Sequence, residues 1–267
     1  MSMETPLLVE RRGGVDILTL NRPEAMNAID LPMIDALTDY FESAQTRIDC
    51  RVVLMRGAGK CFSAGADLNS GAFAAPGPGR AQRQMAMQRR YSRVVRLMRQ
   101  CPQPIIGLLH GVAAGGAFSL LLAADVRIAA NGARMNAAFI RIGLSGGDMG
   151  SSYLLPRLIG MANASEVLMS GRFVDAERAK AIGLVTDVVE PDALLDAGLT
   201  LADDMLKASP MGLRITKECL NAALAIPGLE AAMALEDRQQ VMLMETADHL
   251  EAVKAFRERR SPEWSDQ

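Results

Sequence analysis

The chain has 267 residues, of which 49% are hydrophobic and 22% charged, which is enough to bury a substantial core. Its formal net charge is −2, so no excess of Lys and Arg favours a nucleic acid or an anionic membrane as a partner. No run of about 18 apolar residues could span a bilayer, and MSMETPLLVERRGG lacks the apolar core of a signal peptide, so we expect a cytoplasmic protein.

Two strands joined at a glycine pair are predicted at the start of the chain. In LLVERRGGVDILTL, residues 7–20, apolar and polar residues alternate on either side of Gly13-Gly14, which suits a tight turn. Helical periodicity follows over residues 31–44, after the candidate N-cap Asp30. CRVVLMRG, residues 50–57, is a short apolar run typical of a strand buried on both faces.

A stretch rich in Gly, Ala and Pro, residues 69–82, interrupts this pattern. Its composition predicts a mobile loop. It is either a tolerated surface insertion or an adaptable wall over a binding site.

Strands and helices then alternate, which predicts an α/β fold. The predicted strands are the apolar runs PIIGLLHG, DVRIAA and GLVTDVV, at residues 104–111, 125–130 and 183–189. Helical patterns cover residues 81–99, 117–124, 164–170 and 175–182, the last with Asp175 as its N-cap.

From Leu195 onward the sequence predicts only amphipathic helices, ending in the charged stretch HLEAVKAFRERRSPEW. Ser209 is a candidate N-cap and Pro210 takes the first helical position, where its missing N–H costs nothing. We therefore divide the chain into a core, residues 1–195, and a C-terminal helical region, residues 196–267. Such an appendage serves assembly or acts as a lid.

Several familiar catalytic motifs are absent. GAGKC, residues 57–61, has Leu54 and Cys61 where a Walker phosphate loop needs Gly and Ser or Thr. Neither G-x-G-x-x-G after a strand nor G-x-S-x-G occurs. A Ser-His-Asp triad would need His110 or His249, which we interpret as a structural and a solvated histidine.

The cysteines do not form a metal or disulfide pattern. Cys50, Cys61, Cys101 and Cys219 are far apart and include no C-x-x-C pair, which favours reduced thiols. We expect no metal site.

Two glycine-bearing turns each follow a predicted strand: GKCFSAGADL and GVAAGGAFSLLLAAD. Glycine permits close approach and unusual dihedrals, so backbone N–H groups near Ala66 and Gly116 could donate to an anionic oxygen. A helix predicted just after the glycine pair adds its partial positive charge. Either turn alone is explained by tight packing, but the two together are what an oxyanion site needs.

These segments resemble the enoyl-CoA hydratase/isomerase (crotonase) family, and the likeness covers nearly the whole chain. It is carried by LNRPEAMNAID, FSAGADL, PQPIIGLLHGVAAGG, AADVRIAA, GLSGGDMGSSYLLPRLIG, SGRFVDAERAKAIGLVTDVV and FRERRSPEW. The resemblance implies a spiral of ββα units and a C-terminal helical region that builds trimers, commonly stacked as hexamers. It also implies an acyl-CoA thioester as ligand, with coenzyme A as part of the substrate and no separate cofactor.

The resemblance also assigns the site residues. The two oxyanion donors match the backbone amides of Ala66 and Gly116. Residues 69–82 correspond to the variable loop near the acyl group. The residues expected to contact substrate are Met26, Ala64, Gly65, Asp67, Leu68, Gly115, Ser119 and Phe139.

The acid–base residues of ordinary hydratases are missing. Hydratases of this family use two glutamates, at positions that match Ser119 and Phe139. Hydration needs one group to activate water and another to transfer the α-proton, and this chain lacks both glutamates. Ser119 either binds a substrate or water, or faces neighbouring backbone.

A lone carboxylate, Asp148, lies within IGLSGGDMGSSYLL. It resembles the aspartate of dienoyl-CoA isomerases, epoxide-thioester isomerases and aryl-CoA dehalogenases. An apolar, glycine-rich surround raises a carboxyl pKa, and one carboxylate can move a proton between two carbons. The alternative is that Asp148 caps a helix beginning near Met149.

The predicted function is enoyl-CoA isomerisation, with the enolate in the oxyanion hole and Asp148 as acid and base. One alternative is an atypical hydratase using Ser119 and Asp148. A second is a dehalogenase with Asp148 as nucleophile, which the scarcity of aromatic residues disfavours, since Trp264 is the only tryptophan. The third is a protein that binds acyl-CoA without turning it over.

Overall fold

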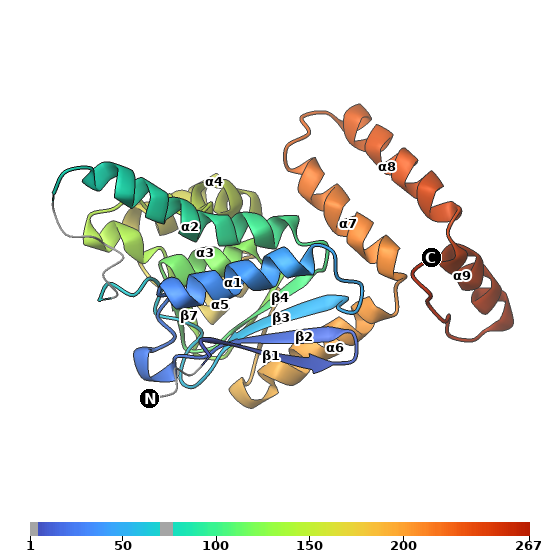
Figure 1. Cartoon of the computed structure of the whole chain (residues 1–267), viewed down its shortest axis with the longest axis horizontal. Helices are drawn as coiled ribbons and strands as arrows, with labels where there is room; N and C mark the ends of the chain where they lie inside the picture. Colours follow the sequence, from blue (N-terminus) through green and yellow to red (C-terminus); the bar gives the residue numbers. More distant parts are fainter. Residues whose placement is uncertain (1–4, 70–76) are drawn as a thin grey trace.

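The computed structural model describes residues 5–69 and 77–267. Residues 70–76 of the predicted loop lie outside this range. Figure 1 shows the chain as a layered α/β core from which a group of helices projects. The α/β class is confirmed.

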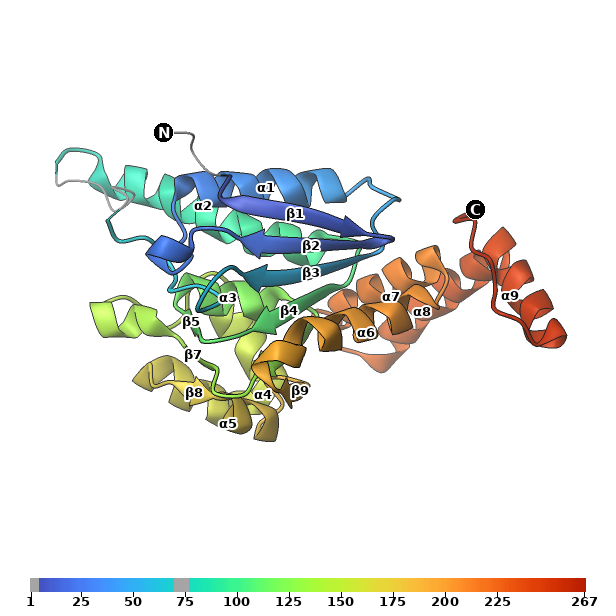
Figure 2. The ribbon, with the colours of Figure 1, turned by 90° about the horizontal axis from the view of Figure 1, so that it is seen from below.

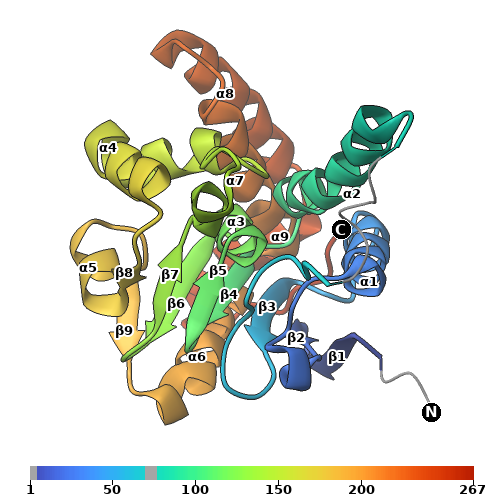
Figure 3. The same cartoon turned by 90° about the vertical axis from the view of Figure 1, so that its left-hand side faces the viewer.

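A six-stranded sheet forms the main layer, and Figure 3 shows it nearly end-on. Its strands, in spatial order, are β1 (Leu7–Arg12), β2 (Val15–Leu20), β3 (Val52–Gly57), β4 (Ile105–Leu109), β6 (Val126–Ala130) and β9 (Asp187–Val189). β1 and β2 pair antiparallel through the predicted turn, where Gly13 has φ +59°, and the other neighbours pair parallel. Every residue of β4 is buried, as expected for a strand covered on both faces.

A smaller sheet makes the fold a spiral. It contains β5 (Val112–Ala114), β7 (Arg134–Asn136) and β8 (Val174–Asp175). β4 and β5 precede α3 (Gly116–Ala123), and β6 and β7 precede the 3-10 turn η2 (Ala138–Ile142) and α4 (Ser151–Ser170). Each unit gives one strand to each sheet before its helix, so the predicted ββα spiral is confirmed.

Helices cover both faces of the main sheet (Figure 3). On one side lie α1 (Leu31–Ala44), α2 (Arg80–Gln100) and α3, while α6 (Leu194–Leu206) packs on the other. The predicted caps form: the carboxylates of Asp30 and Asp175 accept hydrogen bonds from the amides of Met33 and Arg178, at the starts of α1 and α5 (Ala176–Ala181). The remaining 3-10 turns are η1 (Pro23–Ala25) and η3 (Pro191–Ala193).

The C-terminal helices α7 (Pro210–Ala223), α8 (Leu229–Met244) and α9 (Ala247–Glu258) project from one end of the core (Figures 1 and 2). Lys217 Nζ of α7 joins them to it, lying 2.7 Å from Asp125 Oδ2 and donating to the Gln103 carbonyl at 2.8 Å. The predicted boundary at residue 195 falls at the start of α6, which packs on the main sheet. The division into two regions stays a prediction. Among the described helices, none is long and apolar enough to cross a membrane.

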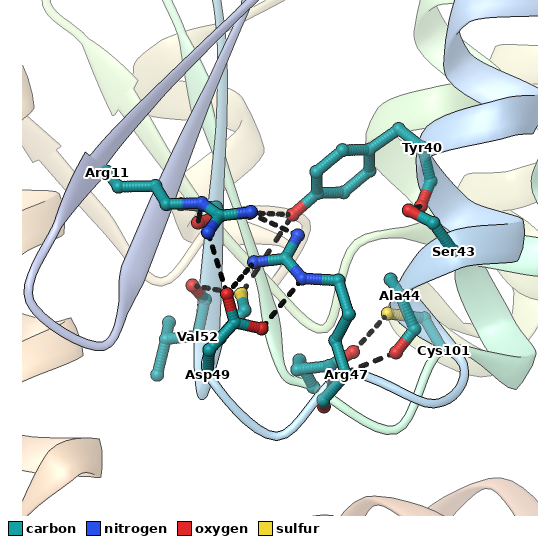
Figure 4. A network of polar contacts seen from close by, with 11 residues as sticks. Arg11, Tyr40, Ser43, Ala44, Arg47, Asp49, Val52 and Cys101 are labelled. Atoms are coloured by element: carbon teal, nitrogen blue, oxygen red, sulfur yellow. Dashed lines mark hydrogen bonds and ion pairs between the residues drawn. The ribbon is translucent and has the colours of Figure 1, made fainter.

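A polar network around the buried Asp16 links the β1–β2 hairpin to α1 and to the loop before β3 (Figure 4). Asp16, which is 1% exposed, accepts hydrogen bonds from Tyr40 Oη at 2.8 Å and Arg47 Nη1 at 2.7 Å. Arg11 and Arg47 both pair with Asp49. Burial raises the pKa of the Tyr40 hydroxyl, so it stays a donor. The network lies at the start of β2, away from the strand ends that carry the glycine turns.

The structure corrects two predicted elements. The strand at 183–189 is limited to β9, because Gly183 takes φ +77° and the Leu184 amide turns back to the Ala179 carbonyl. The helix at 164–170 is the end of the longer α4, which is interrupted at Gly160 with φ +76° and ψ 159°.

Candidate active site

The two glycine-bearing turns come together in space. Ala66 lies in the segment after β3, and Gly116 is the first residue of α3. A Cβ added to Gly116 would lie 3.9 Å from the Ala66 nitrogen, and one added to Gly65 would lie 3.5 Å from the Gly116 nitrogen. The two backbone amides therefore adjoin.

Local hydrogen bonding explains why both backbone N–H groups are left to donate to a ligand. Ala66 forms a parallel bridge with Ile29, in which the Ile29 amide donates to the Gly65 carbonyl at 2.8 Å and the Asp67 amide donates to the Ile29 carbonyl at 3.0 Å. The Ala66 N–H therefore points away from Ile29. Gly116 is one of the first residues of α3, whose amides have no intrahelical acceptor. Within residues 5–69 and 77–267, neither N–H donates to another protein group.

Glycine is required at two positions in this arrangement. Gly65 has φ +92°, and a Cβ there would meet the Ala114 carbonyl oxygen at 2.4 Å. Gly115 has φ +52° and ψ −120° as the N-cap of α3. A side chain at either residue would strain the backbone, and one at Gly65 would also separate the two turns.

Polar contacts hold the Ala66 segment in place. Ser63 Oγ donates to the Asn27 carbonyl at 2.7 Å and accepts from the Gly65 amide at 3.1 Å. Arg22 Nη1 lies 3.1 Å from Asp30 Oδ2 and 3.0 Å from Asp67 Oδ2. The resemblance placed Asp67 near the substrate, but nothing in the sequence indicated its ion pair with Arg22.

A small, mainly apolar pocket opens beside the two amides. Its described lining consists of Ala66, Leu68, Gln84, Met87, Gln88, Tyr91, Gly116, Phe139, Ile142, Leu144, Asp148 and Met149. Asp148 is the only carboxylate among these residues. A pocket lined by apolar groups with a few polar ones suits a small organic ligand.

Some of the predicted site residues line the pocket and others do not. Ala66, Leu68, Gly116, Phe139 and Asp148 line it. The remaining predicted contacts are outside its described lining: Met26, Ala64, Gly65, Asp67, Gly115 and Ser119.

Sequence reasoning missed the wall supplied by α2. Gln84, Met87, Gln88 and Tyr91 lie at helical spacings of i, i+3, i+4 and i+7, so they share one face. This spacing is readable in the sequence, but only the fold shows that the face turns toward Asp148.

Asp148 is half-buried, and every hydrogen bond that its side chain accepts from the described residues falls on one oxygen. Oδ1 accepts hydrogen bonds from the Met149 amide at 2.7 Å and from Gln88 Nε2. Oδ2 accepts none from the described part of the chain. Burial raises the pKa of the Asp148 carboxyl, and the two hydrogen bonds partly oppose that rise.

The capping interpretation of Asp148 is wrong. The N-cap of α4 is Gly150, with φ +85° and no side-chain hydrogen bond. Ser151 Oγ accepts from the Asp148 amide at 3.0 Å, and Ser119 Oγ donates to the Asp148 carbonyl at 3.1 Å. Ser119 thus faces neighbouring backbone, as the alternative for this residue expected. Its direct contact with substrate stays a prediction.

Neither histidine belongs to the pocket lining. His110 Nε2 lies 3.1 Å from the Gly59 carbonyl oxygen, and burial lowers the pKa of its imidazole. His249 is exposed on α9. These positions fit the structural and solvated roles expected for them.

Comparison with known proteins gives consistent matches over almost the full length. The family model described as enoyl-CoA hydratase/isomerase matches residues 10–267. A protein of Mycobacterium tuberculosis named probable enoyl-CoA hydratase is 38% identical over 267 residues, covering 97% of this chain and 93% of its own. The 1,2-epoxyphenylacetyl-CoA isomerase of Escherichia coli is 34% identical over 252 residues, covering 94% and 95%. The crystal structure of an enoyl-CoA hydratase from Bacillus anthracis superimposes with a TM-score of 0.92 at 28% identity, covering 98% and 100%.

Proposed function

The chain belongs to the enoyl-CoA hydratase/isomerase family, and from this premise we propose that it is an enoyl-CoA isomerase in which Asp148 is both acid and base. The observation that carries the proposal is the pocket lining, where Asp148 is the only carboxylate among the described residues and faces the same space as the Ala66 and Gly116 amides. Coenzyme A would enter as part of the substrate.

The two amides would bind the thioester carbonyl oxygen. When a proton leaves the carbon next to the thioester, negative charge develops on that oxygen. Two fixed N–H donors stabilise this charge without reorganising, and a single such donor is worth about 10²–10³ in rate. The partial positive charge at the N-terminus of α3 acts in the same direction.

Asp148 would then move one proton. With a 3-enoyl thioester, the Asp148 carboxylate takes a proton from C2, and the C–H electrons form a dienolate held by the two amides. The resulting carboxylic acid returns the proton to C4, so the double bond moves from C3–C4 to C2–C3. No atom is gained or lost, and no oxidant is needed. The raised pKa of the carboxyl makes it a stronger base than an exposed aspartate.

Hydration is the second candidate, because the similar mycobacterial protein is named a probable enoyl-CoA hydratase. A hydratase must activate water and also protonate the α-carbon. The two positions matching hydratase glutamates hold Ser119, which donates to the Asp148 carbonyl, and Phe139, which lines the pocket. A single carboxylate would have to perform both tasks, so the pocket favours isomerisation.

Substrate profiling distinguishes these functions. Purified protein and Asp148→Asn are incubated with 2-enoyl-, 3-enoyl- and dienoyl-CoA thioesters, and products are separated by chromatography with mass detection. We expect double-bond migration without a change of mass, abolished in Asp148→Asn. A product heavier by one water supports hydration. Tight binding without α-proton exchange in deuterated water supports a non-catalytic acyl-CoA-binding protein.

We also propose that the C-terminal helices mediate self-association into trimers or hexamers. Large apolar side chains are exposed on α8 and α9, including Leu229 at 73%, Leu250 at 66% and Phe256 at 86%. Exposed apolar surface of this kind marks interfaces. Light scattering after size exclusion should give a mass three or six times that of the chain. A monomer at micromolar concentration would refute this.

A further inference from the structure

Two hydrogen-bond donors from different parts of the fold meet on one oxygen of Asp148. Gln88 Nε2 comes from α2, and the Met149 N–H comes from the turn before α4, and both donate to Oδ1. A carboxylate held at one oxygen by two donors has little freedom to rotate. The other oxygen, Oδ2, accepts no hydrogen bond from the described residues.

Helix α2 is fixed relative to the oxyanion turn as well as to Asp148. Tyr91 Oη, one turn after Gln88, donates at 3.1 Å to the carbonyl of Ile29. Ile29 is the residue that bridges to Ala66. One face of α2 therefore contacts both the candidate base and the residue that pairs with Ala66.

The chemistry of Gln88 suits this position. A primary amide donates a hydrogen bond without bringing a charge, whereas Lys or Arg would pair with the carboxylate and weaken it as a base. Tyr91 is the other titratable group in the described lining; burial raises the pKa of its hydroxyl, which is already donated to Ile29. No ion pair to Asp148 is formed by the described residues.

We propose that Gln88 is a positioning residue: with the Met149 amide it holds Asp148 Oδ1, so that Oδ2 is the oxygen that exchanges protons with the acyl chain. This inference rests on the proposed function of Asp148. It assigns Gln88 a role in the proton transfer through its hydrogen bond to Asp148.

The test is the pH dependence of turnover in Gln88→Met, which keeps the length of the side chain and removes its donor. The lost hydrogen bond favoured the carboxylate form, so the acidic limb of the kcat profile should move to higher pH. Losing a hydrogen bond to a charged group should also lower kcat about tenfold to a hundredfold, with KM nearly unchanged. Gln88→Glu should lose more at neutral pH, because two carboxylates would then repel.

Arg89→Met is the matched control, since Arg89 is the next residue of α2 and is outside the pocket lining. Its profile should coincide with that of the wild type. A Gln88→Met profile that also coincides, while Asp148→Asn is inactive, would overturn this inference and leave the proposed function intact. Full turnover in Asp148→Asn would instead remove the function on which the inference rests.

Discussion

Gly65→Ala tests how closely the two turns of the oxyanion site must approach. A Cβ on Gly65 would lie 2.4 Å from the oxygen and 3.2 Å from the carbon of the Ala114 carbonyl. Both are backbone atoms of β5, so they cannot rotate away as a side chain would. The substitution must therefore displace the Ala66 segment from the start of α3.

Two effects of different size follow. Alanine at φ +92° is strained, which costs about 1–2 kcal/mol of stability. Moving the Ala66 amide out of position removes one oxyanion donor, which costs about 10²–10³ in rate, or about 2.7–4 kcal/mol of transition-state stabilisation. We expect kcat/KM to fall by that factor, together with a loss of stability that exceeds the strain alone because the backbone is displaced.

Gly132→Ala is the control that separates strain from displacement. Gly132 has φ +77°, but a Cβ there meets nothing within 4 Å. Thermal unfolding should therefore show a similar strain cost, while kcat/KM on the preferred enoyl-CoA stays at the wild-type value. If Gly65→Ala turns over as fast as Gly132→Ala, the Ala66 amide is not an oxyanion donor and the reasoning is refuted.

Three further predictions follow from the same contacts. Burial raises the folded-state pKa of the Asp148 carboxyl, so the native state loses stability as the pH rises from the unfolded to the folded pKa. Asp148→Asn should therefore raise Tm at neutral pH. If the variant kept this higher Tm at a pH below the unfolded-state pKa, burial of the charged carboxylate would not be the cause. Apart from Asp148 the described lining carries no charged side chain, so a hydrocarbon enoyl-CoA should be turned over at least about tenfold faster than one ending in a carboxylate; equal kcat/KM values would contradict it. Lys217 is 4% exposed and lies 2.7 Å from Asp125, so Lys217→Met should lower the free energy of unfolding in urea by about 3 kcal/mol. The exposed Lys207→Met should leave the free energy of unfolding unchanged. Equal losses in the two variants would contradict the anchoring role of Lys217.

Local signals in the sequence predicted local structure well. The glycine turn between β1 and β2 and the caps at Asp30, Asp175 and Ser209 form as expected, because each depends on residues within a few positions. The strands β5, β7 and β8 were missed because two or three residues are too few to establish a period.

Contacts between distant parts of the chain could not be predicted in this way. The hydrogen bond from Gln88 to Asp148 joins residues 60 positions apart, and the ion pair of Arg22 with Asp67 joins residues 45 apart. The capping interpretation of Asp148 failed for a related reason. Met149 adopts φ +47°, so the chain turns once more before α4 begins.

The most direct test of Asp148 as acid and base is a reaction with a 3-enoyl-CoA in deuterated water. Wild-type protein should yield the 2-enoyl-CoA and exchange protons at C2 and C4, and Asp148→Asn should do neither while still binding the thioester. Isomerisation and exchange at the wild-type rate in Asp148→Asn would contradict the account.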